Sequence, residues 1–137
     1  ARGATSLWED FLAPEAAIHS RNHHFFGDIS GWFLQTVAGI VPNPYLEDPD
    51  SILAAPHFIR SLRYAEGSYD TPSGHIALRW ERVGQGDKEN DIISLNIRYS
   101  GKISGRICLP AGWEFEDGFC QKELREGNHI CRNTMPA

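Results

Sequence analysis

The sequence predicts a mixed α and β protein, in which one long helix precedes a compact antiparallel β domain. The hydrophobic period changes from three-to-four residues in the first half to two in the second. A Pro- and Asp-rich connector, VPNPYLEDPD (41–50), lies at this change. The 137 residues, 41% of them hydrophobic, suffice for one ordinary domain, or for one domain plus a fragment.

The first half is predicted to be helical from Asn22 to Ile40. Apolar residues recur there at three- and four-residue steps and form one stripe: Phe26, Ile29, Trp32, Phe33, Val37 and Ile40. Ser20 or Asn22 can cap the start, and Gly39 followed by two prolines is a stop signal. One amphipathic helix cannot bury its own stripe. It therefore docks on the β domain or packs against partners outside this sequence, and two glycines and several aromatics on its surface favour the second alternative.

The second half is predicted to contain five or six short antiparallel strands. Apolar residues alternate with polar ones in GHIALRWER (74–82), DIISLNIRY (91–99) and KISGRICLP (102–110), joined by the turn-like segments TPSG, GQGDKEN and SG. Shorter strand candidates are HFIRS (57–61), RYAEGSYD (63–70) and GNHICR (127–132). This pattern is typical of a β-sandwich or an open barrel.

Composition disfavours several functional classes. The net charge is −5, and the 13 Lys and Arg residues are scattered, which argues against a nucleic-acid-binding face. No apolar window is long enough to cross a membrane. Three cysteines are too few for a disulfide framework, so one disulfide plus a free thiol and three reduced thiols both stay open. The sequence has no GxSxG, GxGxxG or P-loop motif.

Two segments contain candidate chemistry. Glu9 lies between Trp8 and Asp10, and desolvation beside an aromatic ring raises a carboxyl pKa toward a general acid or base. For a single Glu, however, a solvated acid in a loop is the commoner interpretation. In HSRNHHFFGD (19–28), His19 and His23 are four residues apart, but no third ligand follows at metal-site spacing. A hydrogen-bonding role for His23 in a cleft is therefore favoured over a metal site.

Three motifs resemble a known family in the same order. GATSLWEDF (3–11), SRNHHFFGDISGWFLQTVAGI (20–40) and PHFIRSLRYAEGSYDTPSGHIALRWE (56–81) are similar to the C-terminal end of the α-L-rhamnosidases of glycoside hydrolase family 78. The resemblance implies that residues 1–45 are the closing helical segment of an (α/α)6 catalytic barrel. It implies that residues 46–137 form the C-terminal β-sandwich, with most of the barrel in upstream sequence.

The same resemblance implies an activity and its residues. Family members are inverting hydrolases whose two carboxyl groups stand about 6.5–9.5 Å apart, with a water between. Glu9 matches the general base, whereas His23 and Trp8 match residues of the sugar-binding pocket. The general acid belongs to upstream sequence, and the base–water chemistry needs no metal or cofactor. The expected partner is a rhamnose-containing glycoside or polysaccharide, met outside the cell or in the periplasm.

The chain also departs from the family pattern. Asp10 stands where the family tends to have Arg, which reverses a charge beside the proposed base. The segment between Glu9 and His23 is shorter than usual, so the pocket is expected to accept different neighbours of the rhamnose. Two alternatives stay open: a non-catalytic carbohydrate-binding or structural β-sandwich, and a glycosidase of the same fold that acts on another sugar.

Overall fold

The computed structural model describes residues 28–44, 48–83 and 91–135. The chain divides into two units, Ala1–Trp32 and Phe33–Ala137. The described part of the first unit is the short helix α1, Asp28–Trp32. The second unit begins with a π-helical segment, η3, at Phe33–Ala38, and continues with the strands.

The helix predicted from Asn22 to Ile40 is confirmed between Asp28 and Ala38, and residues 22–27 lie outside the described residues. Its predicted end at Ile40 is wrong, because Ile40 is the first residue of a strand. Gly39 ends the helix, as its sequence position indicated, with a φ of 89° that favours glycine. Its amide donates to the Leu34 carbonyl at 3.0 Å. A Cβ at this position would collide with the backbone of Pro56.

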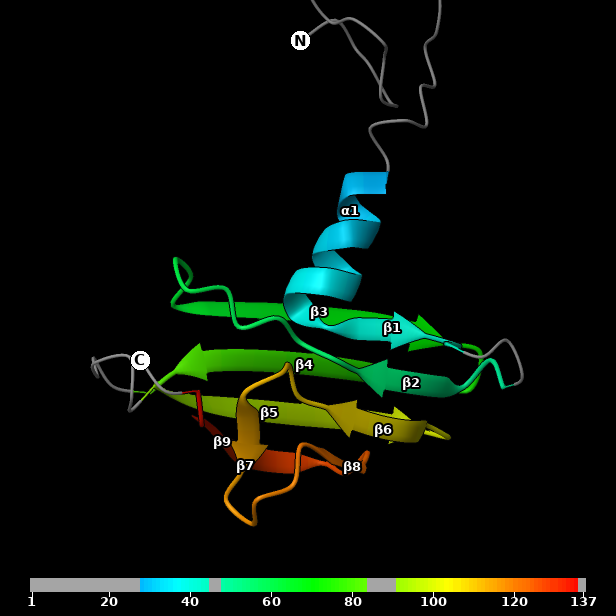
Figure 1. Ribbon diagram of the computed structural model, residues 1–137. Helices are drawn as coiled ribbons and strands as arrows, with labels where there is room; N and C mark the ends of the chain where they lie inside the picture. Colours follow the sequence, from blue (N-terminus) through cyan, green and yellow to red (C-terminus); the bar gives the residue numbers. More distant parts are fainter. Residues whose placement is uncertain (1–27, 45–47, 84–90, 136–137) are drawn as a thin grey trace, which may run out of the picture. The chain divides into compact units, whose positions relative to one another are not determined.

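The second unit is a sandwich of two sheets (Figure 1). The four-stranded sheet has the order β1 (Ile40–Pro42), β2 (Ser51–Ala54), β6 (Ser104–Cys108) and β8 (Gln121–Glu123). The five-stranded sheet has the order β3 (Tyr64–Thr71), β4 (Gly74–Arg82), β5 (Ile92–Gly101), β9 (Gly127–Asn133) and β7 (Trp113–Phe115). All neighbours are antiparallel except β2 and β6, which are parallel.

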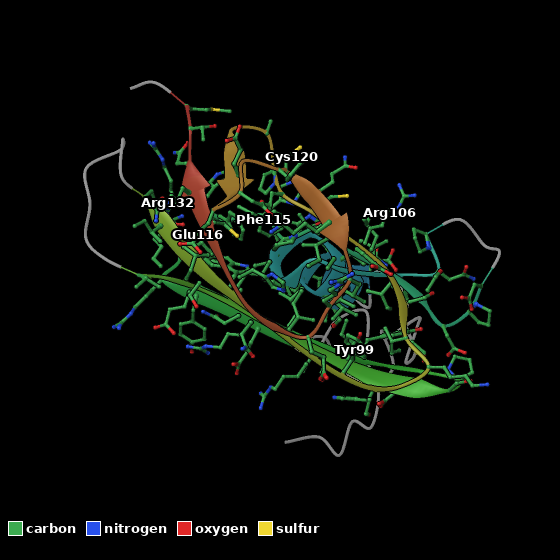
Figure 2. All side chains as sticks on the ribbon, turned by 90° about the horizontal axis from the view of Figure 1, so that it is seen from below. Tyr99, Arg106, Phe115, Glu116, Cys120 and Arg132 are labelled. Carbon is green, nitrogen blue, oxygen red and sulfur yellow. The ribbon has the colours of Figure 1, made fainter. Side chains whose placement is uncertain are left out.

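The core lies between the two sheets, where Figure 2 shows side chains from both layers. Inward-facing residues of β4 and β5 are fully buried, and Trp80 is the largest of them. The Trp80 indole donates to the Val37 carbonyl at 2.8 Å, so a buried polar group is satisfied by the last turn of η3. The ring of Phe58 packs edge-on against Trp80 and Trp113, with centroids 5.6 and 4.7 Å apart.

Most of the predicted strands are confirmed. The alternating segments form β4, β5 and β6, the two shorter candidates at 63–70 and 127–132 form β3 and β9, and TPSG forms the tight turn between β3 and β4. The SG link, in contrast, carries the chain from one sheet to the other, because β5 and β6 belong to different sheets. Two sheets with separate edges make the domain a sandwich rather than an open barrel.

The predicted strand HFIRS (57–61) is wrong. These residues form a loop, because the Phe58 and Ile59 carbonyls accept from the Arg82 guanidinium at 3.0 and 3.2 Å instead of from a neighbouring strand. Four strands, β1, β2, β7 and β8, are absent from the prediction. Each has only three or four residues, too few for an alternating pattern to be recognised. Within the described ranges, no helix is long and apolar enough to cross a membrane.

Candidate functional site

The three residues that the family resemblance assigns to the catalytic pocket, Trp8, Glu9 and His23, lie outside the described residues. Their roles therefore stay predictions. The described sandwich has several surface hollows with polar linings, among them the following two, and none was predicted from the sequence.

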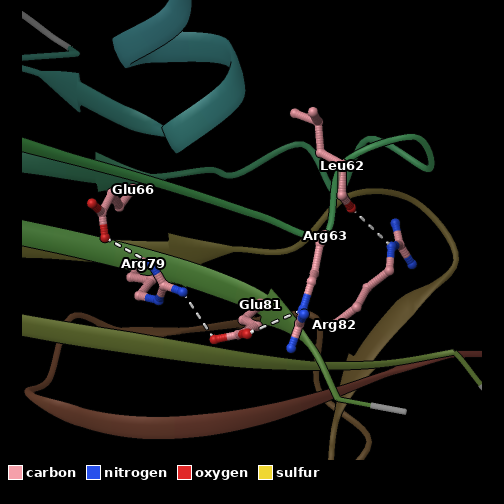
Figure 3. Close-up of polar contacts among 6 residues, drawn as sticks. All are labelled: Leu62, Arg63, Glu66, Arg79, Glu81 and Arg82. Atoms are coloured by element: carbon pink, nitrogen blue, oxygen red, sulfur yellow. Dashed lines mark hydrogen bonds and ion pairs between the residues drawn. The ribbon is translucent and has the colours of Figure 1, made fainter. Parts of the chain in front are cut away.

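The outer face of the five-stranded sheet carries a chain of charged residues, shown in Figure 3. The Arg79 guanidinium donates to Glu66 at 2.8 Å and to Glu81 at 3.0 Å, and Arg63 lies 3.6 Å from Glu81. The hydrogen bonds that Glu66 and Glu81 accept from the guanidinium raise the pKa of Arg79. The same guanidinium lies 4.2 Å above the ring of Tyr64. These charges satisfy one another, so the network orders the sheet surface.

A hollow of about 310 Å³ lies beside this network. Its floor contains Ser68 and Ala77, which are direct partners on β3 and β4, and their small side chains leave space above the sheet. Asn96 and Arg98 of β5 provide further hydrogen-bonding groups at its edge. None of the described residues that line this hollow is aromatic. The arrangement can hydrogen-bond a hydroxylated ligand, but it provides no stacking platform.

A second hollow, of about 390 Å³, lies at the turn between β7 and β8. Its lining combines an exposed aromatic ring with acidic, basic and imidazole side chains: Asp117, Phe119, Lys122, Glu123, Arg125 and His129. The Lys122 ammonium lies 2.6 Å from an Asp117 carboxylate oxygen, and this hydrogen bond lowers the pKa of Asp117. On the neighbouring surface, Arg132 of β9 donates to Glu116 at 3.4 Å, and both residues are labelled in Figure 2.

Neither hollow has a clear sequence signature, because their residues come from separate strands or from one irregular turn. An aromatic residue between Gly118 and Cys120, inside an otherwise polar run, was the one available sign of the second hollow. No group of three or more His, Cys, Asp or Glu within the described part of the chain is arranged to hold a metal ion.

The three cysteines are unpaired. Cys120 is exposed, Cys108 is half-buried and Cys131 is buried. Burial raises the pKa of Cys131 to about 12 and raises that of Cys108 as well. Of the two alternatives left open by the sequence, three free thiols is the state that this structure contains.

No protein-family model matches the chain. Two curated proteins do, both named α-L-rhamnosidase. The protein from Alteromonas sp. (strain LOR) is 31% identical over 103 residues, which are 69% of this chain and 11% of that protein. The protein from Formosa agariphila is 26% identical over 117 residues, which are 80% of this chain and 12% of that protein. The chain thus spans about a tenth of the length of the curated relatives it matches.

A comparison of folds agrees with the sequence matches. A solved α-L-rhamnosidase structure from Dictyoglumus thermophilum superposes with a TM-score of 0.63 at 21% identity, over 97% of this chain and 16% of that one. At this identity the superposition shows a shared fold. The two sequence matches confirm the family resemblance and identify this chain as a relative of the α-L-rhamnosidases.

Proposed function

We propose that this chain is the C-terminal part of an inverting α-L-rhamnosidase that releases α-L-rhamnose from rhamnosides or rhamnose-containing polysaccharides. The observation that carries the proposal is the 31% identity over 103 residues to a protein of that name. The relatives are much longer than this chain, so the proposed activity is that of a larger parent enzyme. The proposed location of such an enzyme is outside the cell or in the periplasm, where it would bind its substrate.

The proposed reaction assigns one step to this chain. Glu9 accepts a proton from a water whose oxygen attacks the anomeric carbon, while an acid from upstream sequence protonates the leaving glycosidic oxygen. His23 hydrogen-bonds the sugar, and the Trp8 ring packs against its apolar face. Asp10 places a second carboxylate beside the base, and like charge at short range raises the pKa of Glu9 if both face one pocket.

The proposed organisation has two parts. Residues 1–45 are proposed to close the (α/α)6 barrel, and residues 46–137 to form the accessory sandwich. The strands of the sandwich begin earlier than this division, at Ile40. The short β1, which pairs with β2 at the edge of its sheet, is therefore the junction between the two proposed parts.

Replacing Glu9 tests the assignment of the base. In the complete parent enzyme, Glu9→Gln is expected to lower kcat for an aryl rhamnoside by several orders of magnitude without changing the fold. Glu15→Gln, six residues downstream, is the matched control and should leave kcat unchanged. Near-normal turnover by the Glu9→Gln enzyme would remove Glu9 from the mechanism. The 137-residue chain alone is expected to release no rhamnose, because it lacks the general acid.

Replacing His23 tests the sugar-binding assignment. His23→Ala is expected to raise KM and lower kcat together, since a lost contact to the bound sugar weakens both the ground state and the transition state. Steady-state kinetics of the complete enzyme measure both constants. If neither changes while Glu9→Gln is inactive, His23 has a structural role only.

The alternative of a non-catalytic carbohydrate-binding sandwich is separated from this proposal by glycan titration. Affinity that survives deletion of residues 1–32, which precede the sandwich unit, in a parent protein without hydrolase activity, favours the binding module. A glycosidase of the same fold with another specificity is distinguished by screening the parent enzyme against aryl glycosides of several sugars.

A further inference from the structure

The turn between β7 and β8 presents an aromatic ring to solvent. Phe119 is 64% exposed, the highest value among the large hydrophobic side chains of the described residues. The turn is fixed by three hydrogen bonds: Gly118 N to Phe115 O at 2.9 Å, Phe115 N to Phe119 O at 2.9 Å, and Phe119 N to the Asp117 carboxylate at 3.4 Å. Because the backbone of Phe119 is held in place, a ligand that covers its ring has little chain entropy to overcome.

Charged and polar groups converge beside this ring. Lys122 is fixed from two sides, since its ammonium lies 2.6 Å from Asp117 and 4.4 Å from the ring centroid of Phe115. The His129 ring packs against Phe115 with centroids 5.8 Å apart, and its Nε2 lies 3.2 Å from the Arg125 carbonyl. The hollow therefore has a rigid inner wall.

The outer wall of the same hollow is an exposed ion pair. The Arg125 guanidinium donates to Glu123 at 3.0 Å, and the two side chains are 75% and 73% exposed. An ion pair this exposed contributes little to stability, so its groups can exchange partners with a ligand at small cost. The hollow thus offers carboxylate acceptors and ammonium and guanidinium donors within reach of one aromatic ring.

This combination matches the chemistry of a sugar ring. A pyranose has an apolar face of C–H groups, which covers an aromatic ring, and a rim of hydroxyls that both donate and accept hydrogen bonds. A purely anionic ligand would leave the Phe119 ring without a contact, and an apolar peptide would leave the charged rim unpaired. An exposed Phe alone would need no explanation, but here it stands on a fixed turn at the edge of a polar hollow.

We propose that Phe119 and the hollow of about 390 Å³ beside it form a binding site for a neutral pyranose unit of a glycan. The choice of rhamnose as that unit rests on the proposed function. Its C6 methyl group adds apolar surface that a hydroxymethyl sugar lacks. The sandwich then contributes to the parent enzyme by holding the rhamnose-bearing chain.

Ligand-detected NMR and calorimetric titration of the 137-residue chain test the site with methyl α-L-rhamnopyranoside and methyl α-D-glucopyranoside. The wild-type chain is expected to bind the rhamnoside, and Phe119→Ala to weaken binding by about tenfold or more through loss of the stacking area. Phe119→Tyr keeps the ring and should retain the affinity. Tyr64→Ala removes another exposed aromatic ring, outside the hollow, and should bind like wild type. Near-ultraviolet circular dichroism checks that each variant is folded.

Two results would overturn the site: no binding of either pyranoside, or equal affinity in wild type and Phe119→Ala. Binding of the glucoside with the same dependence on Phe119 supports the site and overturns its preference for rhamnose. The titration measures binding and not hydrolysis, so its outcome does not depend on whether Glu9 is the base. Failure of the site therefore shows in titration, whereas failure of the proposed function shows in rhamnose release.

Discussion

Arg82 is expected to be the charged residue on which the stability of the sandwich most depends. Its guanidinium donates to the carbonyls of Phe58, Ile59 and Leu62 at 3.0, 3.2 and 3.3 Å and pairs with Asp91. The Arg82 and Asp91 side chains are only 15% and 18% exposed. Replacing Arg82 by Lys keeps the charge but leaves an ammonium that reaches fewer of these acceptors.

The expected loss in the free energy of unfolding follows from the number of hydrogen bonds that Arg82→Lys removes. A hydrogen bond to a charged group contributes about 1.5–3 kcal/mol, and a lysine can satisfy roughly half of the four acceptors. Allowing for partial access of water, Arg82→Lys is expected to lower the free energy of unfolding by about 2–4 kcal/mol. For a domain of this size, the corresponding fall in Tm is roughly 6–15 °C.

Urea titration followed by near-ultraviolet circular dichroism measures this loss, and hydrogen exchange locates it. The amides of the 57–62 loop should lose protection first, since the guanidinium holds that loop. Arg63→Lys is the matched control: Arg63 is 82% exposed and lies 3.6 Å from Glu81, so its replacement should change stability by less than about 0.5 kcal/mol. If Arg82→Lys is as stable as Arg63→Lys, the loop is held by packing alone and the reasoning is refuted.

Three further predictions concern single positions. Gly39→Ala is expected to unfold at a clearly lower urea concentration than Gly118→Ala. Both glycines have a positive φ, which strains an alanine by about 1–2 kcal/mol, but only at Gly39 would the added Cβ also collide with backbone atoms. Equal urea midpoints of the two variants would contradict this. In thiol labelling of the folded chain, exposed Cys120 should react first, and buried Cys131, whose pKa is raised to about 12, should react only on unfolding; early modification of Cys131 in a peptide map would count against it. Hydrogen bonding to Lys122 lowers the pKa of Asp117, so the contribution of this carboxylate to stability is present above the ordinary carboxyl pKa and is lost as pH falls through the folded pKa. Asp117→Asn should therefore lose less stability than wild type when the pH is lowered from about 6 to 3. Parallel curves of unfolding free energy against pH would disprove this prediction.

The sequence predicted the long strands because their pattern is local. In β4 and β5 each inward residue is followed by an outward one, so burial and alternation agree. The loop at 57–61 was mistaken for a strand because HFIRS is a short run that contains an aromatic and a β-branched residue. What decides its conformation is Arg82, more than 20 residues away in sequence, which occupies the carbonyls that a strand would use. Short edge strands such as β7 and β8 depend in the same way on distant partners.

The candidate sites show the same contrast between a local sequence pattern and contacts between distant residues. Trp8, Glu9 and His23 were found because a family motif is contiguous in sequence, and a motif can be matched without any structure. The hollow beside Phe119 has no such motif: its ring comes from a turn, and its polar wall from β8, β9 and the residues between them. Its members converge only through the pairing of β7 with β9 and of β6 with β8. A sequence motif therefore marks the segment that is proposed to be catalytic but leaves the sandwich unmarked.

Three residues near the end of β4 contact the end of η3, the loop that follows β2 and the outer surface of the sheet. Trp80 points inward and binds the Val37 carbonyl, which secures the end of η3 to the core. Arg79 points outward and binds two carboxylates, and Arg82 holds the loop that follows β2. These roles follow from strand alternation, since successive residues face opposite sides. Insertion of one residue here would exchange the two faces, expose Trp80 and release η3 and the loop together. The helix end, the loop and the sheet surface are therefore expected to unfold as one cooperative unit, and hydrogen exchange that protects the β4 amides but not the amide of Gly39 would contradict this.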